Sequence, residues 1–373
     1  MRAVGIILAG GNNNRMKELT HKRAVAAMPI AGSYRSIDFA LSNMTNSHIQ
    51  KVAVLTQYNA RSLNEHLNSS KWWNFGRKQG GLYVFTPTIT NDNGYWYRGT
   101  ADAIYQNMDF LKKSHEPYVV IASGDAVYKM DYGKVLQYHI DKKADVTVVC
   151  KEMDPSDDVS RFGTIRMDDD MRITEFEEKP MVTKSNMIST GIYVIRRRLL
   201  IDLIEHAAEE ERFDFVNDVL IRYKNLKKIY GYKIDHYWSN IATVDAYYKT
   251  NMDFLKPEVR NYFFKQDPEI YSKVSDLPPA KYNPGASVKN SLVGSGSIIN
   301  GTVENSVIFK QVFVGNNCVI KNSVILNAVY LGDNTHIENC IVESRDTIRA
   351  NSYYCGEEGE VKIVVEKNER YVL

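Results

Sequence analysis

The sequence has few cysteines, no long hydrophobic run and no excess of charge of either sign. Its four cysteines are scattered, without a CxxC pair or the spacing of a metal site, so we expect buried thiols rather than disulfides or bound zinc. The apolar run from Ala3 to Leu8 is too short for a membrane span or for the core of a signal peptide. We therefore expect a cytoplasmic protein with no membrane partner.

The charges are nearly balanced, with 47 Lys and Arg against 45 Asp and Glu, which gives a net charge of +2. This balance lacks the excess of basic residues that is typical of nucleic-acid-binding proteins, so no nucleic-acid partner is expected. At 373 residues the chain is longer than one typical domain, and two domains are expected.

Up to about Leu255, short β-branched runs alternate with longer helical stretches, as in a parallel sheet with crossover helices. The pattern predicts strands at 4–8, 52–56, 118–122, 146–149 and 192–195, and helices at 36–46, 101–112, 132–142, 197–210 and 244–255. The strand at 118–122 leads directly into Ser123, Gly124 and Asp125. Open α/β sheets bind their ligands at the carboxyl ends of strands, so chemistry is expected near Asp125.

A repeating sequence pattern begins near Pro284. Four segments align there, and their asparagines are spaced by 15, 17 and 17 residues at Asn290, Asn305, Asn322 and Asn339. Aliphatic residues recur between Gly or Asn corners, which predicts a triangular β-helix of hexapeptides with about four coils. A β-sandwich explains the regular spacing less well. Such a solenoid has no pocket of its own and an open end, so packing or subunit contact is its expected role.

The loop after the first strand contains Gly10, Gly11 and Arg15. Consecutive backbone N–H groups in such a loop can bind phosphate oxygens, and the arginine adds positive charge. A double glycine after a strand is, taken alone, more often only a tight turn.

Seven blocks of the first domain resemble one family. They are LAGG (8–11), LTHKRA (19–24), YRSIDFALSN (34–43), VLTQY (54–58), WYRGTADA (96–103), GDAVYKMDY (124–132) and FEEKP (176–180). In order and approximate spacing they resemble the signatures of ADP-glucose pyrophosphorylases, the glucose-1-phosphate adenylyltransferase family, and the resemblance extends through the repeat. It implies an α/β fold: a nucleotidyltransferase, Rossmann-like mixed-sheet domain over 1–256, a linker over 257–284 and a left-handed parallel β-helix of hexapeptide repeats over 285–373.

The resemblance implies that glucose-1-phosphate attacks the α-phosphate of ATP, which yields ADP-glucose and pyrophosphate. Charged phosphates meet in such a site, so catalysis depends on positioning and on cations, including Mg²⁺ held by carboxylates and phosphate oxygens. Matching positions imply these roles: Arg15 and Asp125 as catalytic residues, with Asp125 also binding the metal; Gly10, Gly11, Gln57, Tyr97 and Gly99 for the nucleotide; Glu178, Lys179 and Ser189 for glucose-1-phosphate; and Lys22 for an effector. A solvated loop lysine explains Lys22 equally well.

Several positions depart from the family pattern. Val25 stands where the family has a phosphate-facing lysine, and Asn240 stands where it has a second metal-binding aspartate. Asn13 replaces a third loop glycine, and Val216-Asn217 replaces Gly-Lys. Loss of one charged group aimed at a transition state costs on the order of 10²–10³ in rate, so impaired catalysis is expected. The alternative is that Lys17 or Lys22 compensates and the chain is a competent adenylyltransferase.

The departures resemble the non-catalytic, GlgD-type subunit of bacterial glycogen synthesis. This implies a regulatory subunit that modulates a catalytic glucose-1-phosphate adenylyltransferase partner in a homo- or hetero-tetramer. ATP, ADP-glucose and glucose-1-phosphate are the ligands that it implies. A third interpretation, a β-helix acyltransferase, has little support, because His336 is the one histidine of the repeat and no acyl-carrier site surrounds it.

Overall fold

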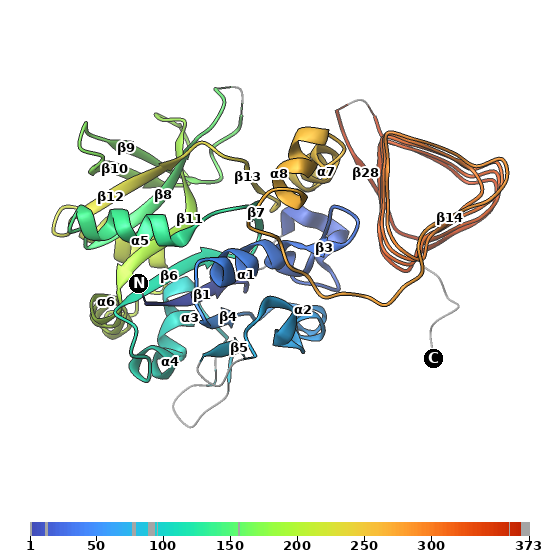
Figure 1. Ribbon diagram of the computed structural model, residues 1–373. Coiled ribbons are helices and arrows are strands. Elements are labelled where there is room, and N and C mark those ends of the chain that lie inside the picture. The colour runs from blue at the N-terminus through green and yellow to red at the C-terminus, as the bar shows by residue number, and fades with distance from the viewer. Residues whose placement is uncertain are drawn as a thin grey trace.

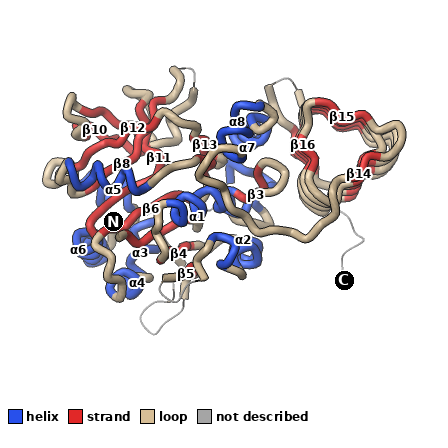
Figure 2. The backbone as a smooth tube through the Cα atoms, in the orientation of Figure 1, coloured by secondary structure: helices blue, strands red, loops and turns tan. Residues whose placement is uncertain are grey.

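A computed structural model describes residues 2–11, 14–76, 80–88, 94, 96–155, 157–357 and 359–366. A sheet covered by helices forms the first part of the molecule, and a triangular β-helix, seen along its axis, forms the second (Figure 1). The tube in Figure 2 shows the same change from mixed helices and strands to strands and turns alone. The prediction of a mixed-sheet α/β domain followed by a β-helix is confirmed.

Within the described residues, nine strands form the main sheet, in the order β10-β9-β11-β6-β1-β4-β5, with β8 beside β11 and β12 beside β8. Strands β1, β4, β5 and β6 run parallel, whereas β11 is antiparallel to both β6 and β8, so the sheet is mixed. The bounds are β1 (Ala3–Leu8), β4 (Lys51–Leu55), β5 (Gly81–Phe85), β6 (Tyr118–Ser123), β8 (Val146–Glu152), β9 (Gly163–Met167), β10 (Ile173–Glu178), β11 (Met187–Arg196) and β12 (Ile229–Ile234).

Helices cover both faces of this sheet because its strands alternate apolar side chains to both sides. In β1, Val4 and Ile6 enter the core on one face, and Ala3 and Ile7 enter the core on the other. The α-helices are α1 (Ser36–Asn46), α2 (Ala60–Leu67), α3 (Thr100–Gln106), α4 (Met108–Lys112), α5 (Tyr132–Asp141), α6 (Arg197–Glu209), α7 (Val244–Asp253) and α8 (Pro257–Phe264). Short helical turns are η1 (Asn14–Thr20), η2 (Val25–Ala27), η3 (Ser70–Trp73) and η4 (Phe215–Ile221), and short strands are β2 (Pro29–Ile30), β3 (Tyr34–Arg35), β7 (Ala126–Tyr128) and β13 (Trp238–Asn240).

The single helix expected over 101–112 is wrong, because the chain breaks into α3 and α4 at Asn107. The Asn107 side-chain amide donates to the Ala103 carbonyl at 2.9 Å and to the Tyr97 hydroxyl at 2.9 Å. An asparagine that binds nearby backbone in this way competes with helix hydrogen bonds, which explains the break.

The β-helix consists of three parallel sheets, each of five described strands rather than the expected four or so. The first sheet contains β14 (Lys281–Tyr282), β17 (Ile298–Ile299), β20 (Phe313–Val314), β23 (Tyr330–Leu331) and β26 (Thr347–Ile348). The second sheet contains β15 (Ser287–Lys289), β18 (Thr302–Glu304), β21 (Val319–Lys321), β24 (His336–Glu338) and β27 (Tyr353–Cys355). The third sheet contains β16 (Leu292–Val293), β19 (Val307–Ile308), β22 (Val324–Ile325), β25 (Cys340–Val342) and β28 (Lys362–Val364).

The aligned asparagines form one corner of the β-helix. Asn290, Asn305, Asn322 and Asn339 all have positive φ, between 43° and 51°. The side-chain amide of Asn290 donates to Asn305 at 2.9 Å, and that of Asn305 donates to Asn322 at 2.6 Å. Asparagine suits this corner because it tolerates the left-handed conformation and bonds to the next coil.

The third sheet of the β-helix is apolar on both faces. Ile308 and Ile325 point into the solenoid, whereas Val307 and Val324 point out and join a core shared with the first domain. Helix α7 packs on β22 and, with α8, lies between the two domains (Figure 1). The β-helix is therefore fixed to the first domain by a common core.

The segment expected as a linker begins with α8, whose Phe263 is fully buried in the shared core. Its remainder runs along the first domain to β14, and Lys129 donates to the carbonyls of Tyr262 and Gln266 at 2.7 Å each. The domain boundaries themselves stay a prediction.

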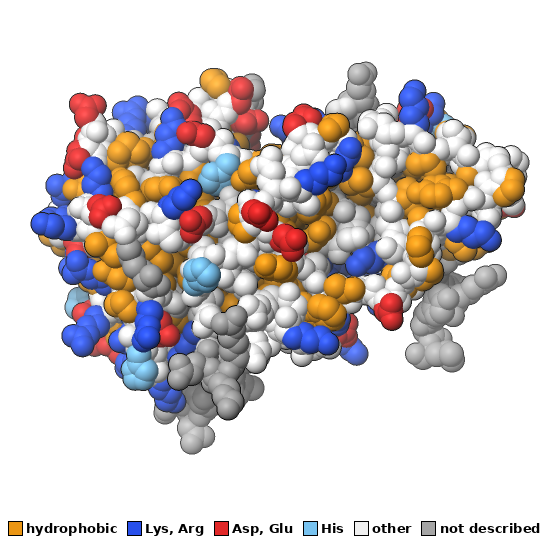
Figure 3. All heavy atoms as spheres, in the orientation of Figure 1, with side chains coloured by type: hydrophobic (Ala, Val, Ile, Leu, Met, Phe, Trp, Pro, Cys, Tyr) orange, Lys and Arg blue, Asp and Glu red, His pale blue; other side chains and the backbone are white. Residues whose placement is uncertain are grey.

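On the face in Figure 3, acidic and basic side chains are interspersed over both domains. No helix in the described ranges has the length and apolar character required to cross a membrane. The cytoplasmic location stays a prediction.

Candidate functional site

Three parallel strands end at one edge of the sheet and bring the expected nucleotide loop and Asp125 together. In register, Leu8 at the end of β1 faces Leu55 at the end of β4 and Ser123 at the end of β6. The residues after these three ends are therefore neighbours in space. This edge is where open α/β sheets bind ligands.

The loop after β1 is attached to β4, because the Ala9 N–H donates to the Leu55 carbonyl at 2.8 Å. A Cβ on Gly10 would stand 3.6 Å from the Gln57 nitrogen, whereas a Cβ on Gly11 would meet nothing within 4 Å. The backbone at Gly11 is thus open to a ligand. Arg15 lies exposed in η1, and Asn12 and Asn13 lie outside the described residues.

Gln57 and Tyr97 hold each other in place. The Gln57 amide donates to the Tyr97 carbonyl at 3.2 Å, and the Tyr97 N–H donates to the Gln57 side-chain oxygen at 2.8 Å. Burial raises the pKa of Tyr97, while its hydrogen bond with Asn107 opposes that rise. Both ends of the Gln57 amide are therefore engaged with the Tyr97 backbone, and contact of Gln57 or Tyr97 with a nucleotide stays a prediction.

Gly99 has a packing reason to be glycine. A Cβ there would stand 2.3 Å from the Phe213 carbonyl oxygen, which also accepts the Ala101 N–H at 2.8 Å. Glycine at position 99 therefore allows the backbone there to lie close to the backbone of Phe213. The role of Gly99 in nucleotide binding stays a prediction.

Asp125 and Asn240 lie side by side. Strand β13 pairs antiparallel with β7, which places Asn240 opposite Ala126, and the Ile241 N–H donates to the Asp125 carbonyl at 2.9 Å. The Asp125 carboxylate accepts a hydrogen bond from the Ser123 hydroxyl, and the Asn240 side-chain oxygen accepts the Ala242 N–H at 3.1 Å. The two positions that the resemblance assigns to the metal are thus brought together.

This donor set does not fit the two-carboxylate magnesium site of the resemblance. Asp125 supplies one carboxylate, and Asn240 supplies a neutral oxygen that already accepts a backbone N–H. Among the described residues, no group of three or more His, Cys, Asp or Glu side chains could hold a metal ion. Mg²⁺ is usually held by one or two carboxylates together with water and substrate phosphates, so magnesium binding together with a nucleotide stays a prediction.

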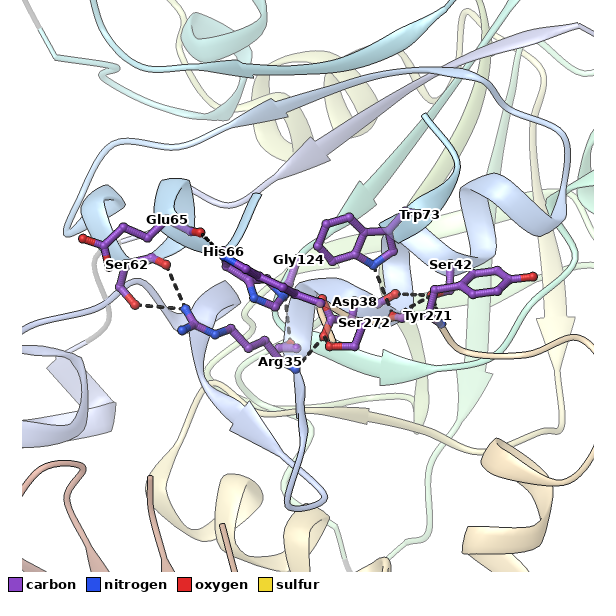
Figure 4. Close-up of polar contacts among 12 residues, drawn as sticks. Arg35, Asp38, Ser42, Ser62, Glu65, His66, Trp73, Gly124, Tyr271 and Ser272 are labelled. Atoms are coloured by element: carbon purple, nitrogen blue, oxygen red, sulfur yellow. Dashed lines mark hydrogen bonds and ion pairs between the residues drawn. The ribbon is translucent and has the colours of Figure 1, made fainter. Parts of the chain in front are cut away.

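A buried network supports the backbone next to Asp125 (Figure 4). The Ser36 hydroxyl at the start of α1 donates to the Gly124 carbonyl at 2.9 Å. Asp38 is fully buried, and its carboxylate contacts His66 and the Ser272 hydroxyl at 2.6 Å each. These residues fix the amino end of α1 and therefore Gly124. Sequence reasoning missed this network, although Ser36 and Asp38 fall inside the family-like block YRSIDFALSN (34–43).

Val25 is buried in an apolar cluster. Its side chain is 7% exposed and packs in one cluster with Met16, Met28 and Ile241. Lys22, three residues earlier, is exposed in a bend. No cation can occupy the space that Val25 fills without a change in this packing.

Arg23 joins this segment to the β-helix. Its guanidinium pairs with the Glu343 carboxylate and donates to the Ser344 hydroxyl at 3.2 Å. Both charged side chains are only 12% exposed. The segment between η1 and η2 is therefore connected directly to the β-helix.

The residues expected for glucose-1-phosphate lie near one another on β10 and β11, which are both paired with β9. Glu178 ends β10, and the Lys179 ammonium lies 3.1 Å from its carboxylate. Burial raises the pKa of Glu178, and Lys179 lowers it. Ser189 in β11 lies 3.3 Å from the Tyr193 hydroxyl.

Two further residues, Tyr193 and Asp214, belong to this group and were missed by sequence reasoning. Burial raises the pKa of Tyr193, and the carboxylates of Glu178 and Asp214 raise it further, so these groups share one environment. Asp214 also caps η4, where it accepts the Asn217 N–H at 2.7 Å. The binding roles of Glu178, Lys179 and Ser189 stay predictions.

Comparison with known proteins gives two family matches. A nucleotidyl transferase family matches residues 4–257, and a GlmU-like, C-terminal hexapeptide family matches residues 278–360. Among curated relatives, the glucose-1-phosphate adenylyltransferase of Clostridium novyi is 40% identical over 320 residues, covering 85% of this chain and 84% of the relative. The enzyme of the same name from Clostridium botulinum strain Alaska E43 is 42% identical over 85% of this chain and 83% of its own, and that of Thermosipho melanesiensis is 40% identical over 85% and 77%.

Proposed function

Because this chain belongs to the glucose-1-phosphate adenylyltransferase family, we propose that it is a catalytically impaired, regulatory subunit of ADP-glucose pyrophosphorylase in glycogen biosynthesis. The reaction of the assembly is ATP plus glucose-1-phosphate to ADP-glucose plus pyrophosphate. The observation that supports impairment is the pair of neutral side chains, Val25 and Asn240, at positions that the family fills with charged groups.

The surroundings of Val25 argue against simple compensation at that position. The side chain is enclosed by apolar neighbours, so a cation from elsewhere would have to enter the same buried space. Exposed Lys22 has no such access, since a charge moved into an apolar cluster loses its hydration. The triphosphate therefore lacks one of its expected counter-charges.

Asn240 argues in the same direction. Its neighbour Asp125 is the single carboxylate of the pair, and an amide oxygen provides no charge to a divalent ion. Each missing charged group costs on the order of 10²–10³ in rate, although the two losses need not multiply. We infer that turnover by the isolated chain is at least about 10²-fold below that of a catalytic subunit.

The second candidate function is a competent adenylyltransferase. It is favoured by the retention of Arg15, Asp125, Glu178, Lys179 and Ser189, and by the names of the relatives. The same residues also suit a subunit that binds substrates without turning them over.

For the regulatory function, we propose that the chain joins a catalytic partner in a hetero-tetramer, with a homo-tetramer as the alternative. The contact of Arg23 with Glu343 supports a regulatory role, because it links the segment after Lys22 to the β-helix. An effector bound near Lys22 would act on both domains at once. The effector role of Lys22 remains part of this proposal.

The test is to titrate the purified chain into its catalytic partner while pyrophosphate release and particle mass are followed together. We expect little release by the chain alone, a mixed oligomer, and an altered rate or effector response of the mixture. Robust turnover by the chain alone would favour the second candidate, and no change in mass or rate on mixing would reject the regulatory role.

A further inference from the structure

Residues 160–163, which lead into β9, contact two groups of the predicted site residues. The Phe162 carbonyl accepts the Lys179 N–H at 3.1 Å, and a Cβ on Gly163 would stand 2.8 Å from the Glu178 carboxylate. The Phe162 ring packs edge-on against Trp238 of β13, with ring centres 5.6 Å apart. This segment therefore lies between the expected sugar-phosphate residues and the strand that ends at Asn240.

Arg161 extends from this segment toward the Asp125 side. Its guanidinium donates to the Thr243 hydroxyl at 3.3 Å, and Thr243 caps α7 by accepting the Ala246 N–H at 3.2 Å. Thr243 follows Asn240 by three residues, and Ile241 between them donates to the Asp125 carbonyl at 2.9 Å. These contacts attach the Arg161 guanidinium to the segment that follows Asn240 and pairs with the backbone of Asp125.

The charges around Arg161 agree with this placement. Burial lowers the pKa of Arg161, Asp158 and Asp125 raise it, and Arg15 lowers it. Arg161 therefore shares one electrostatic environment with both predicted catalytic residues. Within the described part of the chain, no carboxylate forms an ion pair with Arg161, and Thr243 takes only one of the five N–H groups of a guanidinium.

We propose that Arg161 is a phosphate-binding residue that lets this site hold a sugar phosphate or nucleotide sugar without a divalent metal. A guanidinium stays charged at all physiological pH values and presents paired donors to phosphate oxygens. It supplies positive charge on the Asp125 side of the site, where the Asp125–Asn240 pair is short of one carboxylate. This inference rests on the proposed function, and it assigns to the site a metal-independent mode of ligand binding.

The test measures ADP-glucose binding to the full chain by calorimetry, once with EDTA and once with MgCl₂. We expect the wild-type dissociation constant to differ by less than about 3-fold between the two, since the fixed cation belongs to the chain. Arg161→Ala should weaken binding by about 10- to 100-fold, as expected for loss of a charged hydrogen-bonding partner. Arg166→Ala is the matched control, because Arg166 is exposed on β9 and pairs with Glu175.

Arg161→Lys tests the same idea if the alanine variant does not fold. Lysine keeps the charge but not the paired donors, so binding should weaken by roughly 3- to 10-fold and stay independent of magnesium. The proposal is overturned if Arg161→Ala binds like the wild type, if Arg166→Ala loses as much, if wild-type binding requires Mg²⁺, or if ADP-glucose does not bind. None of these results decides the regulatory function, which is tested separately by particle mass and pyrophosphate release when the chain is mixed with its catalytic partner.

Discussion

Replacement of Asn240 by aspartate should give the protein a magnesium-dependent stability that the natural chain lacks. Aspartate keeps the shape of asparagine and the oxygen that accepts the Ala242 N–H at 3.1 Å. It also adds a second carboxylate in the strand next to Asp125, because Asn240 precedes Ile241, whose N–H donates to the Asp125 carbonyl at 2.9 Å. Two neighbouring carboxylates repel each other, and a divalent cation relieves that repulsion.

The size of the effect follows from mass action. Magnesium at ten times its dissociation constant stabilises the folded state by about 1.4 kcal/mol. For a domain of roughly 150–250 residues this raises the melting temperature by about 3–6 °C. The natural chain, with one carboxylate at the site, should shift by less than about 1 °C, because binding that is too weak to saturate gives little stabilisation.

The assay is thermal unfolding of the wild type and of Asn240→Asp, in EDTA and across a magnesium titration. Asn261→Asp is the matched control, since Asn261 is exposed on α8 and undergoes the same chemical change. A folded Asn240→Asp variant that shows no magnesium-dependent shift would refute the reasoning. An equal shift in the wild type would refute it too.

Three further results are expected. Arg23→Ala should lower the free energy of unfolding by about 1–3 kcal/mol in urea titrations, because it leaves the Glu343 carboxylate, 12% exposed, without its cation. Gly99→Ala should cost about 1–3 kcal/mol in the same measurement, because the new Cβ would stand 2.3 Å from the Phe213 carbonyl oxygen. Glu178→Gln should remove a pH dependence of stability. Burial raises the pKa of Glu178 above its usual 4.5, so the folded wild type binds this proton more strongly than the unfolded chain does. The wild type therefore loses stability as pH rises through the raised pKa. Melting temperatures of the wild type and variant across about pH 4 to 7 check this.

Each of these changes has a neighbouring control. Lys22→Ala and Gly11→Ala alter exposed positions, and both should change the free energy of unfolding by less than about 0.5 kcal/mol. Glu177→Gln removes a carboxylate that is 41% exposed and should leave the pH dependence in place. Equal effects in a variant and its control would contradict the structural reason given for that variant.

The sheet and the β-helix were predictable because their side chains repeat with a regular period. Val4 and Ile6 alternate with Ala3 and Ile7 across the sheet, and the asparagine spacing marks the corners of the solenoid. Strands β9, β10 and β12 escaped prediction because exposed polar residues interrupt their apolar pattern.

The site was only partly predictable. Asp125 was found because it follows a buried strand, and its neighbour Asn240 came from the family resemblance alone. The contact of Asp38 with Ser272 joins positions 234 residues apart, and no local pattern indicates such a pairing. Arg161 was missed for the same reason, since its partner Thr243 lies 82 residues further along the chain.

The shared core determines what a break in the connecting segment would do. Val307 and Val324 of the β-helix are buried against the first domain, together with Phe263 of α8, so the adhesion of the two halves does not depend on an intact covalent link after α8. A proteolytic cut between α8 and β14 would therefore yield two fragments that remain associated and elute as a single particle. The β-helix is thus packed onto the first domain through a common core and is not held by the connecting segment alone.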